Sequence, residues 1–288
     1  MENSDNRPRR SVLFMPGSNA RALEKAKTID ADTLVFDLED AVAPTAKAEA
    51  RELVAAALTS GEYGHRELVV RINGLDTEWW RDDLAAVGAA NPDAILLPKV
   101  EDEAALHKVS EEMVWHSTDT DCAFWVMLET PRGFLRAEEI ATSHDRLTTL
   151  VIGTNDLSKE LRARQVPGRE PLLHALSQAL LVARTHGLHI LDGVYGNFKD
   201  EAGFEAECTQ ARDMGFDGKT LIHPSQVEAA NRTFAPTEAE LEQAKRMIAA
   251  FDAAMVDGKG VAVLDGRMIE ELHVAEARRM VRDCENYY

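Results

Sequence analysis

Eight short apolar runs alternate along this chain with stretches of helical pattern, and this alternation limits its possible folds more than any other feature. The runs are Val12–Phe14, Thr33–Phe36, Leu68–Val70, Ala94–Leu97, Ala123–Leu128, Thr148–Ile152, Leu188–Leu191 and Phe216–Leu221. Strands separated by helices lie parallel, and eight such strands close into an α/β fold, the (β/α)8 or TIM barrel. Active sites of these barrels lie where the strands end. Charged or polar side chains follow nearly every run, so the pattern indicates an enzyme.

The chain has 288 residues, which fits one barrel of roughly 250 residues and a C-terminal extension. We expect residues 1–235 to form the catalytic TIM-barrel domain. Residues 236–288 read as a long helix to about Val256, a hairpin near Asp265-Gly266 and a helix over Leu272–Cys284. We expect this helical and hairpin extension to act as a lid or as an arm between subunits.

The net charge of -18 argues against nucleic acid and against anionic membrane surfaces as partners. No apolar stretch of about 18 residues occurs, so we expect no membrane insertion or secretion. One basic island stands out, and it is either a solvated segment or a contact for a phosphate-bearing ligand. Its members are Arg9, Arg10, Arg21 and Lys25. The cysteines Cys122, Cys208 and Cys284 lack metal-like spacing and predict a reduced, cytoplasmic protein with Cys122 and Cys208 buried.

Two carboxylates follow neighbouring strands of the predicted barrel. Glu129 comes directly after the fifth run, and Asp156 comes shortly after the sixth. A single carboxylate at a strand end is more often a helix cap or an ion-pair partner. Two hard oxygen ligands with no nearby His or Cys suit Mg²⁺, which takes its other ligands from water and substrate. The sequence therefore predicts a magnesium site formed by Glu129 and Asp156.

Three more carboxylates, Asp37, Glu39 and Asp40, follow the second run, and so many anions require cations to balance them. Arg71, at the end of the third run, is either a bidentate clamp for a substrate carboxylate or an internal partner of Asp37 or Glu39, and both roles can coexist. Lys99, after the fourth run, is either a Schiff-base lysine or a charge-balancing neighbour of Glu129, and the ionic surroundings favour the second. We assign Asp37, Glu39 and Arg71 to catalysis.

Small residues beside the predicted metal site are candidates for substrate binding. Gly153, Thr154 and Asn155 offer free backbone N–H groups that could hold a developing oxyanion, or they form only a tight turn. His223 precedes a proline and is predicted to cap a helix, as is Ser18 near the N-terminus. The complete set of predicted substrate contacts is Phe14, Arg71, Lys99, Gly153, Thr154 and Asn155.

Several segments together resemble the citrate lyase beta-subunit-like family, which includes malyl-CoA and citramalyl-CoA lyases. They are residues 10–18, 35–42, 71–73, 97–99, 128–133, 217–224 and 266–270. The local patterns at 153–161, 192–195 and 270–273 are most similar to a branch that includes malyl-CoA thioesterases. The resemblance implies a Mg²⁺-dependent barrel, usually a homotrimer or homohexamer, in which Glu129 and Asp156 bind the metal and Arg71 contacts the acid end of the substrate.

The resemblance also implies a catalytic role for Glu270. In the family a neighbouring subunit contributes an aspartate from the C-terminal segment as acid or base on the acetyl carbon, and the matching residue here is Glu270, which is one methylene longer. Such a change of position matters, because a misplacement of about 1 Å can cost about a hundredfold in rate.

The leading hypothesis is a Mg²⁺-dependent carbon–carbon lyase that acts on a short 3-hydroxyacyl-CoA such as (3S)-malyl-CoA or citramalyl-CoA. It would release acetyl-CoA and a 2-oxo acid, with Glu270 protonating the enolate. One alternative is a malyl-CoA thioesterase that uses the same site and yields malate and CoA. A second is a metal-dependent 2-oxo acid aldolase without CoA, which would need neither the extension nor the basic island. A third is a non-catalytic scaffold subunit, which the presence of both metal ligands disfavours.

Overall fold

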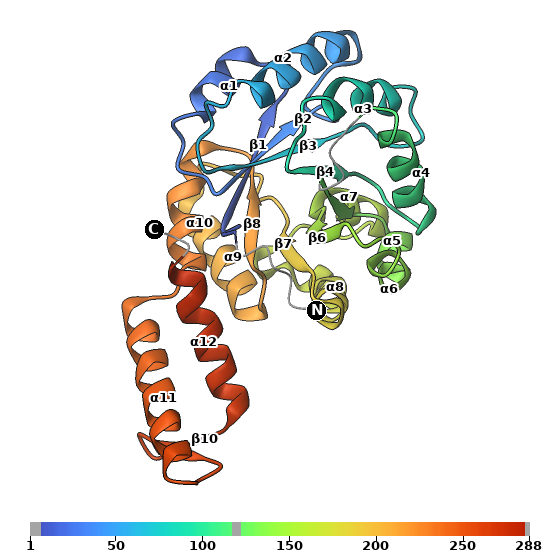
Figure 1. The fold of residues 1–288 in the computed structure, drawn as a ribbon. Coiled ribbons are helices and arrows are strands. Elements are labelled where there is room, and N and C mark those ends of the chain that lie inside the picture. The colour runs from blue at the N-terminus through green and yellow to red at the C-terminus, as the bar shows by residue number, and fades with distance from the viewer. Residues whose placement is uncertain (1–6, 117–121, 286–288) are drawn as a thin grey trace. The chain divides into compact units, whose positions relative to one another are not determined.

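The computed structural model describes residues 7–116 and 122–285 and divides into two compact units. The larger unit comprises Arg9–Phe234, and the smaller unit begins at Ala235. Figure 1 shows the larger unit as a ring of strands surrounded by helices, in colours from blue to orange.

The larger unit is a closed barrel of eight parallel strands, which confirms the predicted fold. Each strand pairs with the next along the chain, and β8 pairs with β1. The register places Asp37 opposite Arg71, so these two residues end neighbouring strands. The strands are β1 Ser11–Pro16, β2 Thr33–Asp37, β3 Glu67–Arg71, β4 Ala94–Leu97, β5 Ala123–Leu128, β6 Leu147–Ile152, β7 His189–Asp192 and β8 Gly218–Leu221.

Helices connect the strands in the order that the sequence pattern predicts (Figure 1). The α-helices are α1 Ala20–Ala26, α2 Lys47–Thr59, α3 Trp80–Gly88, α4 Ala104–Met113, α5 Pro131–Leu135, α6 Ala137–Ala141, α7 Thr154–Leu161, α8 Leu173–His186, α9 Glu201–Met214 and α10 Val227–Phe234. Short 3₁₀ helices are η1 Pro44–Ala46, η2 Pro167–Leu172 and η3 Pro224–Gln226.

Two local predictions about the helices are wrong. The residue that caps α1 is Asn19, whose side chain accepts a hydrogen bond from the Ala22 N–H, rather than its neighbour Ser18. The sequence pattern predicts a single helix over residues 131–142, but two helices form there, because Arg136 has φ -110° and ψ 16° and breaks the helical path. His223 does cap a helix, as predicted, since its side chain accepts from the Ser225 N–H.

Apolar side chains of the strands form two separate cores. One set alternates with the other along each strand and packs with helix residues such as Leu84 and Val109. The second set contains no helix residues, so it fills the barrel interior. Its buried members are Val12, Val35, Val69, Ala94, Leu96, Trp125, Met127, Val151 and Leu191. Cys122 and Cys208 are buried, as predicted.

Ion pairs occupy the amino-terminal ends of the strands. Arg9 bonds to Glu67 at 2.7 Å with both side chains buried, and its guanidinium lies 5.3 Å from the Trp125 ring centroid. Arg10 pairs with Asp32 at 2.7 Å. These two members of the basic island therefore serve the barrel itself, at the end opposite to that where barrel active sites lie.

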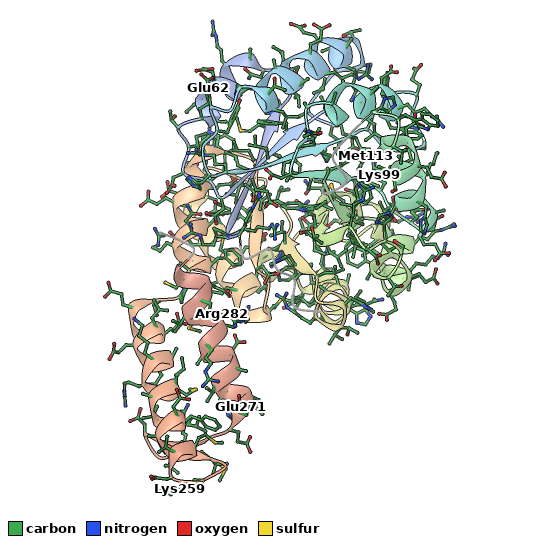
Figure 2. All side chains as sticks on the ribbon, viewed as in Figure 1. Glu62, Lys99, Met113, Lys259, Glu271 and Arg282 are labelled. Carbon is green, nitrogen blue, oxygen red and sulfur yellow. The ribbon has the colours of Figure 1, made fainter. Side chains whose placement is uncertain are left out.

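The smaller unit is a helical hairpin with a short sheet at its turn. It consists of α11 Glu238–Val256, the antiparallel strands β9 Ala262–Leu264 and β10 Arg267–Ile269, and α12 Glu271–Glu285. A small core that includes Phe251, Ile269 and Val274 holds it together. Figure 2 shows Lys259 at the turn of this unit and Glu271 at the start of α12. Its role as a lid or an arm stays a prediction.

No helix among the described residues is both long enough and apolar enough to span a membrane.

Candidate active site

A cavity of about 390 Å³ lies at the carboxyl-terminal ends of the barrel strands. Eight residues predicted from the sequence as metal ligands, catalytic residues or substrate contacts line it together: Phe14, Asp37, Arg71, Glu129, Gly153, Thr154, Asn155 and Asp156. The remaining lining residues are Pro16, Asp40, Ala41, Met127, Ile152, Val194, Thr220 and Ile222. The mouth of the barrel therefore gathers side chains from segments that are far apart in the sequence.

Glu129 and Asp156 line this cavity from the segments that follow the neighbouring strands β5 and β6. Leu128 at the end of β5 pairs with Ile152 at the end of β6, so the segments that follow them lie side by side. Asp156 lies in the first turn of α7. Between them is Gly153, where a Cβ atom would lie 2.3 Å from the Glu129 Cβ. Only glycine therefore lets the Glu129 side chain pass over the end of β6.

Burial disfavours the ionised form of the Glu129 carboxyl group. The residue is 2% exposed, and burial followed by the nearby charge of Glu39 raises its pKa to about 7. Its Oε1 accepts a hydrogen bond of 2.7 Å from the Lys99 N–H, which opposes that rise. Lys99 has φ 49°, a strained conformation for a residue with a side chain. A cation in the cavity would stabilise the ionised carboxylate.

The donor set fits Mg²⁺. Both carboxylates supply hard oxygen ligands, and the lining contains no His or Cys that would favour a softer metal. Within residues 7–116 and 122–285 no three His, Cys, Asp or Glu side chains converge as a ready metal cluster. If these two carboxylates held Mg²⁺, the ion would complete its coordination with water or substrate oxygens.

Arg71 is held in place by carboxylates that line the cavity or lie next to it. Its Nε and Nη2 donate to the two oxygens of Asp37 at 2.7 and 2.6 Å, and Nη1 lies 2.9 Å from Glu39. The guanidinium carbon also lies 4.9 Å from the Phe14 ring centroid. Burial acts to lower the pKa of Arg71, but Asp37 and Glu39 raise it above its ordinary value, so the cation persists. The predicted internal pair is present, and Arg71 still lines the cavity.

Lys99 balances mainly the charge of Glu39, with smaller contributions from Asp40 and Glu129. Its ammonium lies 3.4 Å from Glu39 Oε1, and its side chain is 43% exposed. A Schiff-base lysine needs a desolvated amine with a depressed pKa. Here burial lowers the pKa, but Glu39 and Asp40 outweigh it and raise the pKa above its ordinary value. The surroundings therefore match the charge-balancing interpretation.

The segment that begins at Gly153 is a helix start, not merely a turn. The Gly153 N–H donates to the Leu128 carbonyl at 3.0 Å, so the prediction that this N–H is free is wrong. The next three residues form the first turn of α7, where N–H groups have no partner within the helix. Thr154, Asn155 and Asp156 therefore point the positive end of α7 at the cavity.

Three predicted residues do not line the cavity. Glu39 and Lys99 lie next to it and act on Arg71 and Glu129, as described above. Glu270 belongs to the smaller unit, where it is exposed and its N–H donates to His273 Nδ1. Its catalytic role stays a prediction. Sequence reasoning did not select Val194, Thr220 and Ile222, although each closely follows or ends a predicted strand, and that position was the available signal.

A closed (β/α)8 barrel with this array of carboxylates and arginine at its carboxyl-terminal mouth is a TIM-barrel enzyme. The chain belongs to the HpcH/HpaI aldolase/citrate lyase family, whose family model matches residues 10–224. This confirms the resemblance inferred from the sequence motifs.

Relatives and solved structures agree with this assignment. A (3S)-malyl-CoA thioesterase of Cereibacter sphaeroides is 53% identical over 278 residues, covering 96% of this chain and 95% of the relative. The citrate lyase subunit beta of Leuconostoc mesenteroides is 37% identical and covers 97% of this chain and 94% of its own length. The structure of the CitE protein of Mycobacterium tuberculosis in complex with magnesium, acetoacetate and coenzyme A has a TM-score of 0.79 at 28% identity. That match covers 96% of this chain and 97% of the other.

Proposed function

We propose that this enzyme hydrolyses (3S)-malyl-CoA to malate and CoA in a Mg²⁺-dependent reaction. The observation that carries the proposal is the cavity that Glu129, Asp156 and Arg71 share. The sequence alone favoured the lyase reaction over hydrolysis. The relatives that are 51–53% identical over nearly the whole chain are thioesterases, and they reverse that order.

Each group at the cavity has a role in this proposal. Glu129 and Asp156 hold Mg²⁺, which, when bound, supplies a Lewis acid for the carboxylate and hydroxyl oxygens of the substrate. Arg71 binds the free carboxylate of the malyl group, and Asp37 and Glu39 orient Arg71. The N–H groups of Thr154 and Asn155 face the thioester oxygen and stabilise negative charge that develops on it. Phe14 and Lys99 provide further substrate contacts.

Hydrolysis consumes one water molecule. The water oxygen bonds to the thioester carbon, the carbon–sulfur bond breaks, and the sulfur leaves as CoA thiol after gaining a proton. The developing charge lies on the thioester oxygen, which is where the first turn of α7 is directed in this proposal. The reaction needs no redox partner.

The carbon–carbon lyase reaction is the second candidate, and the citrate lyase beta subunits at 36–39% identity favour it. In that reaction the substrate hydroxyl loses its proton, the bond between C2 and C3 breaks, and glyoxylate leaves the enolate of acetyl-CoA. Glu270, from this chain or from a neighbouring subunit of a homotrimer or homohexamer, would protonate the enolate. The aldolase and scaffold hypotheses are weaker, because neither accounts for a thioesterase among the most similar relatives.

One assay separates the two candidates. The protein is incubated with (3S)-malyl-CoA and Mg²⁺ while free thiol and glyoxylate are measured in parallel, with EDTA as the control. We expect thiol without glyoxylate, and no thiol when EDTA is present. Glyoxylate with acetyl-CoA would support the lyase instead, and Glu270→Gln should then reduce its release at least about tenfold. If neither thiol nor glyoxylate were released, both candidates would be refuted for this acyl group.

A further inference from the structure

A buried lysine that does not line the cavity holds the loop that carries Glu39. Lys47 is the first residue of α2 and is 5% exposed. Its ammonium donates to the carbonyl oxygens of Leu38 at 2.7 Å and Glu39 at 2.8 Å, and to Asn73 Oδ1 at 2.6 Å. An ammonium has three protons, so each of them has an acceptor.

Asn73 links the same loop to the neighbouring helix. Its Nδ2 donates to the Leu38 carbonyl at 2.9 Å and to Asp83 Oδ2 at 2.6 Å. Asp83 is fully buried in α3 and also accepts from Arg51 Nε at 2.7 Å. The peptide between Leu38 and Glu39 is thus tied to α2, to the segment after β3 and to α3.

The side of the loop facing the cavity is fixed by Asp37. Its Oδ1 and Oδ2 accept from the N–H groups of Glu39 at 2.9 Å and Ala41 at 3.1 Å. With the Leu38 and Glu39 carbonyls directed to Lys47 and the amides directed to Asp37, the Glu39 carboxylate is left facing Arg71 and Lys99. Its orientation is therefore set from two sides of the main chain.

Burying the Lys47 ammonium costs free energy, because the charge loses its hydration. Burial lowers the pKa of Lys47, and the carboxylates of Asp83, Asp37 and Glu39 only oppose that effect from beyond direct contact. Among the described residues Lys47 has no carboxylate within ion-pair distance, so its three oxygen acceptors, together with the Trp79 ring whose centroid lies 5.0 Å from the ammonium, compensate its buried charge. A side chain that only filled space between helix and strand would not need this charge.

We propose that Lys47 is a positioning residue that acts through Glu39. By fixing the Leu38 and Glu39 carbonyls, Lys47 directs the Glu39 carboxylate at Arg71 and Lys99. It thereby aligns Arg71, which binds the substrate carboxylate in the proposed function, and Lys99, whose N–H donates to Glu129. The kinetic part of its test rests on the proposed function, whereas the structural part described below does not.

The test is a double-mutant cycle with Lys47→Met and Glu39→Gln, scored by kcat/KM for (3S)-malyl-CoA at saturating Mg²⁺. We expect Lys47→Met to reduce kcat/KM by about 10- to 100-fold, because a misplacement of about 1 Å is that costly. If Lys47 acts through Glu39, adding Lys47→Met to Glu39→Gln should change kcat/KM by less than about threefold. Effects that multiply across the cycle would overturn the proposal.

Arg66→Met is the matched control. Arg66 also bridges two main-chain carbonyls, those of Ile29 at 2.6 Å and Tyr63 at 2.8 Å, but it precedes β3 at the opposite end of the barrel. It should lower the melting temperature while leaving kcat/KM within about twofold of the wild type. Lys47→Gln, which keeps a donor but is too short to reach all three acceptors, replaces Lys47→Met in the cycle if the methionine variant does not fold.

Hydrogen–deuterium exchange tests the positioning without any assumption about the substrate. In the Lys47 variant the amides of residues 38–42 should exchange at least about tenfold faster than in the wild type, and in Arg66→Met they should not. Unchanged exchange at these amides would overturn the proposal even if activity fell. A wild-type enzyme that does not turn over malyl-CoA would overturn only the proposed function, and the exchange result would then decide the role of Lys47.

Discussion

Glu129 combines nearly complete burial with a carboxyl group that must be ionised to bind a metal. Its pKa is raised to about 7, first by burial and then by the charge of Glu39. An acid whose pKa is raised on folding is protonated more readily in the folded state than in the unfolded state. The protein therefore loses stability as the pH rises from the ordinary value of 4.5 toward 7, unless a cation compensates the charge.

This effect predicts how Glu129→Gln changes stability with pH. In EDTA the variant should be about as stable as the wild type near pH 5 and more stable by about 1–3 kcal/mol near pH 8. Mg²⁺ should then stabilise the wild type more than the variant, because the variant binds it more weakly. Urea unfolding at the two pH values, with and without Mg²⁺, measures both differences. If the variant were less stable than the wild type at pH 8 in EDTA, burial would not be what raises the pKa of Glu129.

The junction of β6 and α7 is the element that brings the two proposed metal ligands together. Gly193 approaches the same junction so closely that a Cβ atom there would lie 2.6 Å from Thr154 Oγ1. Lys219, fully buried in β8, donates to the Gly193 carbonyl at 2.6 Å and to Asp192 at the same distance. Strands β7 and β8 thus support the first turn of α7 from outside the cavity.

Gly153→Ala should separate the two carboxylates. The added methyl group would lie 2.3 Å from the Glu129 Cβ and 2.6 Å from its Oε2, so the Glu129 side chain must move. We expect a loss of stability of about 1–3 kcal/mol, the usual range for overpacking, and a Mg²⁺ affinity at least about tenfold weaker. Gly196→Ala is the control, because a Cβ atom at Gly196 would have no atom of the described residues within 4 Å. Equal Mg²⁺ affinities in the two variants would contradict this role for Gly153.

At the scale of the whole molecule, the sequence predicts the barrel because each apolar run has the length of a buried strand and a helical pattern follows it. The residues at and just after the ends of the runs also predict about half of the cavity lining, since parallel strands end at one face of a barrel. These inferences need only the period of the pattern and the topology that it implies.

The remaining features depend on contacts that no local pattern contains. Lys47 and Asn73 meet although 26 positions separate them, and the Arg9–Glu67 pair spans 58 positions. Ser18 and Asn19 are both good helix caps, so composition alone could not choose between them. Glu270 lies in the smaller unit, and its proposed role depends on how subunits assemble.

We propose that Glu129 and Asp156 jointly bind one Mg²⁺ at the mouth of the barrel, and calorimetric titration with Mg²⁺ in the presence of malate measures this binding. We expect one Mg²⁺ per chain in the wild type and an affinity at least about tenfold weaker in both Glu129→Gln and Asp156→Asn. Asp40→Asn removes another carboxylate of the cavity lining, one that is 63% exposed, and should stay within about threefold of the wild type. Wild-type affinity in either Glu129→Gln or Asp156→Asn would contradict the claim.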